Sequence, residues 1–152
     1  MHLALYLGLV HRSELALADA LRSVASTHGD EPDILVLCRK LAAECDCHAE
    51  KLQPFVERYG EEAPAEPERL HNDLFGGTRQ GGIGLLRDLH DLYLMATEVD
   101  ISWLVVLQAA QGARDKALLE IVTECDRETG IQLLWLKSRI KQAAPQALLA
   151  AS

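Results

Sequence analysis

Hydrophobic residues recur at helical intervals along most of the chain. In the first segment, apolar side chains follow one another at spacings of three, four and seven residues, from Leu3 through Leu21 to Val24. This period places them on one side of an amphipathic α-helix. The apolar spacing stays helical throughout the chain, and a strand would instead alternate every second residue. The pattern therefore predicts an all-α protein.

Turn residues divide the pattern into four helices. His28-Gly29-Asp30 suits the end of the first helix, and Pro32 suits the first turn of the second. Gln111-Gly112-Ala113 forms a tight turn before the fourth helix, which Pro145 is expected to stop. The predicted helices cover about residues 2–28, 32–59, 85–111 and 115–143, and all belong to one domain, 1–152.

Two of the predicted helices have unusual features. The third is apolar over most of its circumference, which predicts burial on more than one side. The second contains Pro54, whose missing N–H is expected to kink the last turn. Such a kink offers one route to a small-molecule pocket between the helices.

The segment between the second and third helices, residues 60–84, carries no core pattern of its own. It holds Pro64 and Pro67 and ends in the glycine-rich run GGTRQGGIG. Its length and composition predict a flexible crossover between two helical hairpins. An anion-binding nest formed by the glycine pairs is the alternative, although no P-loop lysine follows them. The fold class is therefore an all-α four-helix bundle of two helical hairpins joined by a long crossover.

Composition and charge narrow the classes of function. Of the 152 residues 49% are hydrophobic and 25% are charged, as in soluble globular proteins, and the net charge is -8. An acidic chain without a Lys/Arg cluster argues against nucleic acid and against an anionic membrane surface as partners. The N-terminal apolar run, Leu3 to Val10, lacks a basic region, and no run approaches the roughly 20 residues of a membrane span. We expect a cytoplasmic protein.

The four cysteines do not form a disulfide framework. Cys38 and Cys45 lie two turns apart on one predicted helix, and Cys45 and Cys47 point to different sides of it. This arrangement indicates a reducing compartment. Cys38, Cys45 and Cys125 are expected to act as small core residues, and Cys47 to be an exposed thiol.

Several charged or polar residues interrupt the apolar faces. Glu14 falls in the middle of the apolar side of the first helix, His48 on that of the second and Asp100 on that of the third. Glu44 lies at the margin of the second helix. On the fourth helix Thr129 and Gln132 are central, and Glu124 and Glu128 lie toward the margin.

These residues also fall at matching heights. Glu14 lies about as far before the first turn as Glu44 and His48 lie after it, and Asp100 lies about as far before the second turn as Glu124 and Glu128 lie after it. Equal distances from the turn of an antiparallel hairpin mean equal height. Within each hairpin the acids and the histidine are therefore predicted to meet near mid-length.

This pattern resembles the ferritin-like superfamily. Its di-iron and di-manganese members place a Glu on the first helix of each hairpin and a Glu-x-x-His pair on the second. Glu14 matches the first acid. The second helix reads Glu44-Cys45-Asp46-Cys47-His48, so a cysteine stands at the position of the motif's histidine and His48 comes one residue later. Glu124 is followed at i+3 by Arg127 and at i+4 by Glu128, so the fourth helix has no such histidine.

The resemblance implies a buried metal centre for redox or oxygen-related chemistry. The candidate ligands are Glu14, Glu44, His48, Asp100, Glu124 and Glu128, with Cys45 and Cys125 beside them. Carboxylates with one imidazole suit iron or manganese, and the neighbouring Cys45 makes zinc a competitor. No residue pattern specifies a substrate or a catalytic nucleophile.

The alternative is a metal-free module of the same fold. His48 would then be a structural core residue that is hydrogen-bonded to Glu14, and Glu124 and Glu128 would be a solvated flank. The apolar third helix, with Trp103 and Trp135, would serve an interface with a partner or with a second copy. A homo-oligomer is expected in either case.

Overall fold

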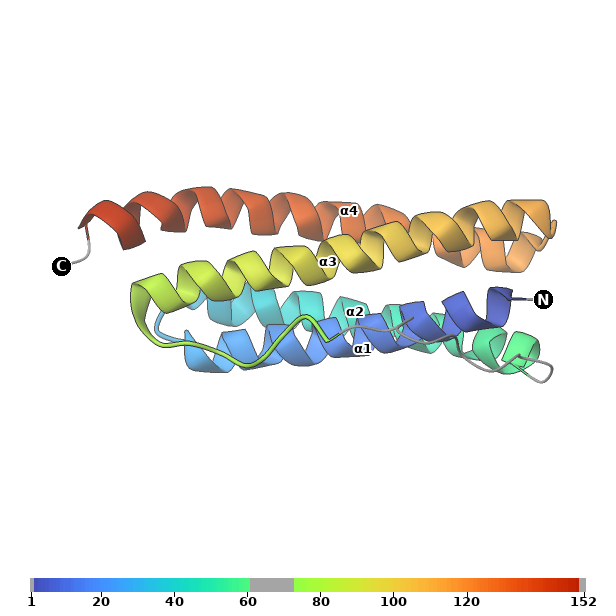
Figure 1. The fold of residues 1–152 in the computed structure, drawn as a ribbon, viewed down its shortest axis with the longest axis horizontal. Helices are drawn as coiled ribbons and strands as arrows, with labels where there is room; N and C mark the ends of the chain where they lie inside the picture. The colour runs from blue at the N-terminus through green and yellow to red at the C-terminus, as the bar shows by residue number, and fades with distance from the viewer. Residues whose placement is uncertain (1, 61–72, 151–152) are drawn as a thin grey trace.

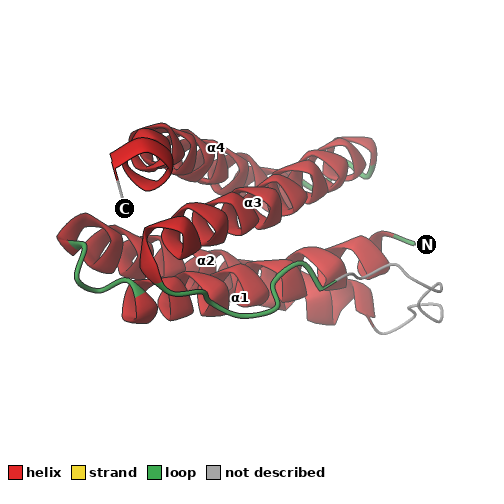
Figure 2. Ribbon diagram, turned by 60° about the vertical axis from the view of Figure 1, so that its left-hand side comes forward, coloured by secondary structure: helices red, strands yellow, loops and turns green. Residues whose placement is uncertain are grey.

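The computed structural model describes residues 2–60 and 73–150, in which the chain forms four long helices and no strand (Figures 1 and 2). The helices are α1 (Leu3–Thr27), α2 (Pro32–Gly60), α3 (Gly81–Gly112) and α4 (Lys116–Pro145). One π-helical turn, η1, follows over Gln146–Ala150. The all-α prediction is confirmed. Residues 61–72 of the predicted connection lie outside the described residues.

Local signals in the sequence set the helix ends. The backbone N–H of His28 bonds to the carbonyl of Val24 and closes α1, and Pro32 begins α2 as its first residue. Asp115 is the N-cap of α4, where its side chain accepts a hydrogen bond from the backbone N–H of Leu118. Gly81, at φ 76°, adopts at the start of α3 a backbone conformation that favours glycine.

Two helix boundaries differ from the prediction. α3 begins at Gly81 rather than near residue 85, because Gly82 and Gly84 join the helix. Pro145 does not stop α4: it is the last α-helical residue, and the chain continues as η1. A proline so close to the helix end removes one backbone hydrogen bond. Ala147 of η1 is buried against the first turn of α3, which holds the extra turn in place.

Packing between helices defines their directions. The closest pairs are α1 with α2, α3 with α4, and α1 with α3, whereas α2 and α4 approach each other less closely. Figure 2 shows α1 and α2 in one layer and α3 and α4 in the other. Glu14 of α1 contacts Trp103 of α3, and His28, farther along α1, contacts Asp88, so these two helices are antiparallel. Since α1 and α2 also run in opposite directions, α3 runs in the direction of α2 (Figure 1).

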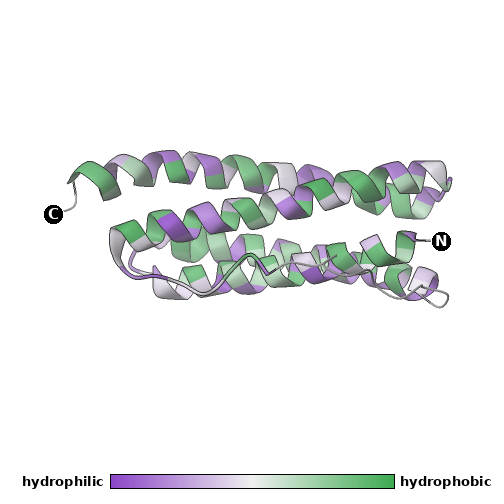
Figure 3. Ribbon diagram, viewed as in Figure 1, coloured by the Kyte–Doolittle hydropathy of each residue, from purple (hydrophilic) through white to green (hydrophobic). Residues whose placement is uncertain are grey.

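One hydrophobic core fills the space between the four helices. Its largest fully buried side chains include Leu7, Leu21, Ile34, Leu52, Leu92, Trp103, Leu118 and Leu136. α3 buries one side only, contrary to the expectation of burial on more than one side, because it packs against α1 and α4 and not against α2. Leu94, Ile101, Leu104 and Val105 remain exposed. Figure 3 shows hydrophobic and hydrophilic residues recurring along the visible face of α3.

The composition of α3 has a second consequence. By length and composition it could cross a membrane, and no other helix in the described part of the chain meets that criterion. This differs from the expectation that no run approaches a membrane span, since the helix carries a long apolar window with few charges. A core helix of a soluble protein meets the same criterion, so the finding is weak evidence for a membrane location.

Candidate functional site

A group of polar side chains lies buried at mid-length, where all four helices contribute. Nδ1 of His48 on α2 lies 3.0 Å from Oε1 of Glu14 on α1, and its Nε2 lies 2.7 Å from Oε2 of Glu128 on α4. The indole N–H of Trp103 on α3 donates to the same Oε1 of Glu14 at 2.7 Å. We call Glu14, His48, Trp103 and Glu128 the polar core cluster. The prediction that Glu14 and His48 meet near mid-length agrees with this arrangement.

Helical geometry explains how four separate elements converge on this cluster. Glu14 lies on the buried side of α1 between Val10 and Leu17, and His48 lies one turn from Cys45 and Leu52 on the buried side of α2. Glu14 and His48 are fully buried, whereas the side chain of Glu128 keeps 26% of its surface exposed. The cluster therefore extends from the core to solvent along α4.

Electrostatics favour a protonated imidazole. Burial lowers the pKa of His48, but the hydrogen bonds and negative charges of Glu14 and Glu128 outweigh it, so the pKa of His48 is raised. When protonated, the imidazolium donates a hydrogen bond to a carboxylate from each ring nitrogen. One oxygen stays without a partner: Oε2 of Glu14 is buried and accepts no hydrogen bond in the described part of the chain. A buried carboxylate oxygen without a partner is costly and is a position for a cation.

Three further residues, Glu44, Cys45 and Gln132, adjoin the cluster. The side-chain amide of Gln132 on α4 donates to Oε2 of Glu44 at 3.1 Å, and the thiol of Cys45 lies 3.8 Å from the amide oxygen of Gln132. Burial raises the pKa of the Cys45 thiol well above its ordinary value, with the negative charge of Glu14 adding to the effect. Burial likewise raises the pKa of Cys125 to about 12. Both thiols are therefore protonated, weak ligands near neutral pH.

The cluster belongs to a longer row of polar contacts between α2 and α4, which we call the α2–α4 seam. Its pairs are Asp33 with Arg139, Glu44 with Gln132, His48 with Glu128, Lys51 with Glu124, and Tyr59 with Asp115. The α4 numbers fall as the α2 numbers rise, so the two helices are antiparallel. α2 and α4 are farther apart than the other neighbouring helices, and long polar side chains span the space between them. In the other neighbouring pairs, apolar side chains fill the contact.

The six predicted ligands are divided between the cluster and its surroundings. Glu14, His48 and Glu128 meet directly, and Glu44 lies beside them through Gln132. Glu124 forms a surface pair with Lys51 at 3.0 Å. Asp100 is partly exposed, and burial with the nearby charge of Asp126 raises its pKa. From α3 it is the indole of Trp103 that joins the cluster.

A second buried polar group lies near the start of α3. Asp88 is fully buried and accepts from His28 at 2.8 Å and from the backbone N–H of Arg79 at 2.9 Å, while the Arg79 guanidinium reaches both Asp88 and Asp91. Sequence reasoning missed Asp88 and Asp91. Their signal was present, because both lie on the side of α3 that carries Leu85, Leu92 and Met95. These contacts fasten residues 79–80 to the ends of α1 and α3.

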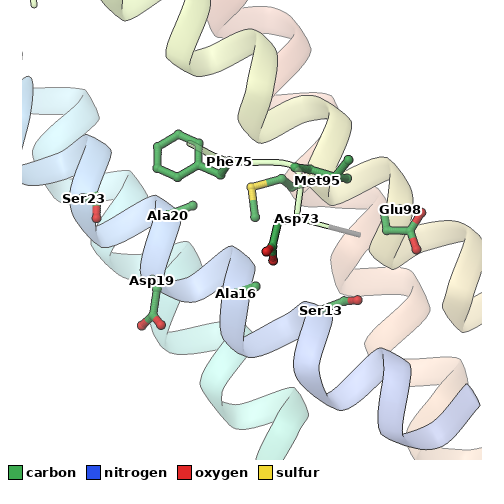
Figure 4. Close-up of a pocket in the computed structure, with 10 residues that line it drawn as sticks. Ser13, Ala16, Asp19, Ala20, Ser23, Asp73, Phe75, Met95 and Glu98 are labelled. Carbon is green, nitrogen blue, oxygen red and sulfur yellow. The ribbon is translucent and has the colours of Figure 1, made fainter. Parts of the chain in front are cut away.

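A surface groove lies along the contact between α1 and α3. It encloses about 260 Å³ and is lined by small residues of α1, by Met95 and Glu98 of α3, and by Phe75 from the segment before α3 (Figure 4). The polar core cluster contributes no residue to this groove. The groove is therefore separate from the cluster.

The side chains of the cluster meet only part of what a metal ion requires. Among the described residues no three His, Cys, Asp or Glu side chains form a group that could hold a metal ion. Glu14 and Glu128 bond to opposite nitrogens of His48, which keeps them apart. The chemistry of the donors nevertheless fits a divalent ion, because two carboxylates, one imidazole and an unpartnered carboxylate oxygen lie within one region.

Comparisons of the chain with protein-family models, with curated proteins and with solved structures give no match.

Proposed function

We propose that the protein is a ferritin-like four-helix bundle, two helical hairpins joined by a crossover, whose polar core cluster binds iron, manganese or zinc for redox or oxygen-related chemistry. The observation that carries the proposal is Oε2 of Glu14, which is buried and without a partner beside His48. A divalent cation would neutralise this oxygen and balance the carboxylates that a single imidazolium leaves in excess.

The residues that would hold the ion are Glu14, His48 and Glu128, with Glu44 released from Gln132. Because Glu14 and Glu128 bond opposite nitrogens of His48, one of these carboxylates would have to leave the imidazole before both could reach the same ion. When bound, the metal supplies a Lewis-acidic or redox-active centre. His48 must give up the proton that now links it to one carboxylate, so metal binding competes with protonation. Trp103 holds Glu14 in place through its indole N–H, and the surrounding apolar core limits access of water. Glu128 is the partly exposed member and forms the route from solvent.

Elemental analysis tests this proposal. Protein purified without added metal is expected to retain stoichiometric iron, manganese or zinc, and Glu14→Gln and His48→Gln are expected to lose it. Asp100→Asn and Glu124→Gln serve as matched controls, because the structure places both residues outside the cluster, and they should retain the metal. Wild-type protein without metal, with a melting temperature that iron, manganese and zinc leave unchanged, would overturn the proposal.

One observation favours the second candidate, a metal-free interaction module. Both ring nitrogens of His48 already bond to carboxylates, so a protonated His48 can link Glu14 and Glu128 without a metal ion. No metal would then displace the His48 proton, and the protein would act through its outer surface. Here the chelator EDTA has no effect on melting temperature, and His48→Gln changes stability without changing metal content.

A further inference from the structure

We propose that α3 forms an antiparallel homodimer through an exposed row of residues on its outer side. The row consists of Ile83, Arg87, His90, Leu94, Glu98 and Ile101, which we call the α3 stripe. The inference concerns the outer surface and does not depend on a metal in the core. It gives the apolar face of α3 a specific occupant, a second copy of this chain.

Helical spacing places the stripe along one line. Successive members are three or four residues apart, so their side chains project from the same side of the helix. All six are exposed, and the apolar ones are unusually so: Ile83 is 57%, Leu94 47% and Ile101 54% exposed. The buried side of α3 already packs against α1 and α4, and no other helix of the described residues covers the stripe. Glu98 stands at the edge of the stripe, where it also lines the groove between α1 and α3.

The order of residues along the stripe is self-complementary. A twofold axis crossing α3 at the level of Leu92 brings each residue opposite a different residue of the second copy. Ile83 then faces Ile101, Arg87 faces Glu98, and His90 faces Leu94. Because the interface is isologous, each of these contacts occurs twice. Two apolar pairs and two ion pairs of opposite charge result, and no like charges meet along the stripe.

The charges of the stripe are available for this pairing. The side chain of Glu98 makes no hydrogen bond or ion pair within the described residues. Arg87 lies 3.0 Å from Nδ1 of His90 and 3.6 Å from the largely buried Asp91. Its side chain is 49% exposed, and pairing with Glu98 of a second copy would replace these contacts within its own helix. Two copies of a chain with net charge -8 repel each other, so a matched pair of opposite charges is needed to fix the register.

The size of the stripe sets the strength of the dimer. From Ile83 to Ile101 the helix extends about 27 Å. A contact between single helices of this length is smaller than the roughly 800 Å² per partner of a standard interface. We therefore expect a reversible, concentration-dependent dimer.

Charge reversal tests both the dimer and its register. Sedimentation equilibrium of the full chain over about a hundredfold range of concentration should show a monomer–dimer equilibrium. Arg87→Glu and Glu98→Arg each place like charges opposite each other twice and should raise the dissociation constant at least about tenfold. The double variant recreates both ion pairs and should return to within about threefold of the wild type. Circular dichroism confirms that each variant is folded.

Apolar variants complete the test. Ile101→Glu should abolish the dimer, whereas Val36→Glu, at a residue of α2 that is 63% exposed and away from α3, should leave it unchanged. A wild type that is monomeric throughout overturns the proposal, including one that instead floats with anionic phospholipid vesicles. A dimer that the single reversals do not weaken, or that the double variant does not restore, overturns the α3 register.

Discussion

Nε2 of His48 lies 2.7 Å from Oε2 of Glu128, and this contact joins α2 to α4 at the centre of the molecule. The same imidazole bonds Glu14 of α1 through its other nitrogen. One side chain therefore links three helices, and its protonation state determines whether a positive charge offsets part of the negative charge of two carboxylates. The stability of the whole structure is expected to depend on this residue.

The charge of His48 predicts a pH dependence. Since the pKa of His48 is raised in the folded protein, its contribution is full below the unfolded value of about 6.5 and is lost as pH rises through the folded pKa. The free energy of unfolding of EDTA-treated protein should therefore fall as pH rises above about 6.5 and through the raised pKa of the folded state. His48→Gln should remove this part of the dependence and cost about 3–5 kcal/mol at pH 6, because Glu14 stays buried without a cation. Urea unfolding of both proteins across this range measures it, and parallel pH profiles would contradict it.

Trp103 predicts a second effect on the same carboxylate. Trp103→Phe removes the indole N–H that donates to Glu14 and should destabilise the protein by about 1–3 kcal/mol, because a buried acceptor loses a partner. Trp135→Phe is the matched control, since Trp135 is partly buried and its indole makes no hydrogen bond in the described part of the chain. Its cost should stay below about 1 kcal/mol. Chemical denaturation measures the free energy of unfolding of both variants. Equal losses of stability would show that the smaller ring, and not the lost hydrogen bond, destabilises Trp103→Phe.

Two glycines should respond oppositely to alanine. A Cβ at Gly84 would lie 2.8 Å from the backbone carbon of Arg79, so Gly84→Ala must displace the turn that Arg79 forms against Asp88. We expect a loss of about 1–3 kcal/mol. Gly130 lies inside α4 with nothing within 4 Å of the added atom, and Gly130→Ala should stabilise the helix by about 0.5–1 kcal/mol. Thermal melts of both variants check the signs, and a neutral Gly84→Ala would refute the close contact.

The four cysteines are expected to differ in their reactivity toward thiol reagents. Cys47 is exposed, whereas Cys38, Cys45 and Cys125 are buried and have raised pKa values, with Cys38 and Cys125 at about 12. Ellman's reagent at pH 8 should therefore modify one thiol rapidly in the native protein and all four in urea. Cys47→Ser should abolish the fast phase. A second fast thiol in that variant would show that the core opens on the timescale of the assay.

The periodicity of the sequence predicted more of the fold than of the candidate site. Apolar residues at helical spacing located four helices, because each helix must bury one side. The departures came where tertiary contacts act: Ala147 packs on the first turn of α3 and lets the chain continue helically past Pro145. Glu14 and His48 could be recognised because each interrupts an apolar row. Asp100 also interrupts such a row, but the rotation of α3 turns Trp103 toward Glu14 instead.

By itself the sequence determined the helices, their approximate ends and the presence of a buried acid and imidazole near mid-length, since all of these depend on local spacing. Tertiary structure alone decided which helices are neighbours, because a long connection permits either direction for α3. It also decided that a polar seam joins α2 to α4 and that one side of α3 stays exposed. Both follow from the relative rotation and separation of helices, which no local pattern records.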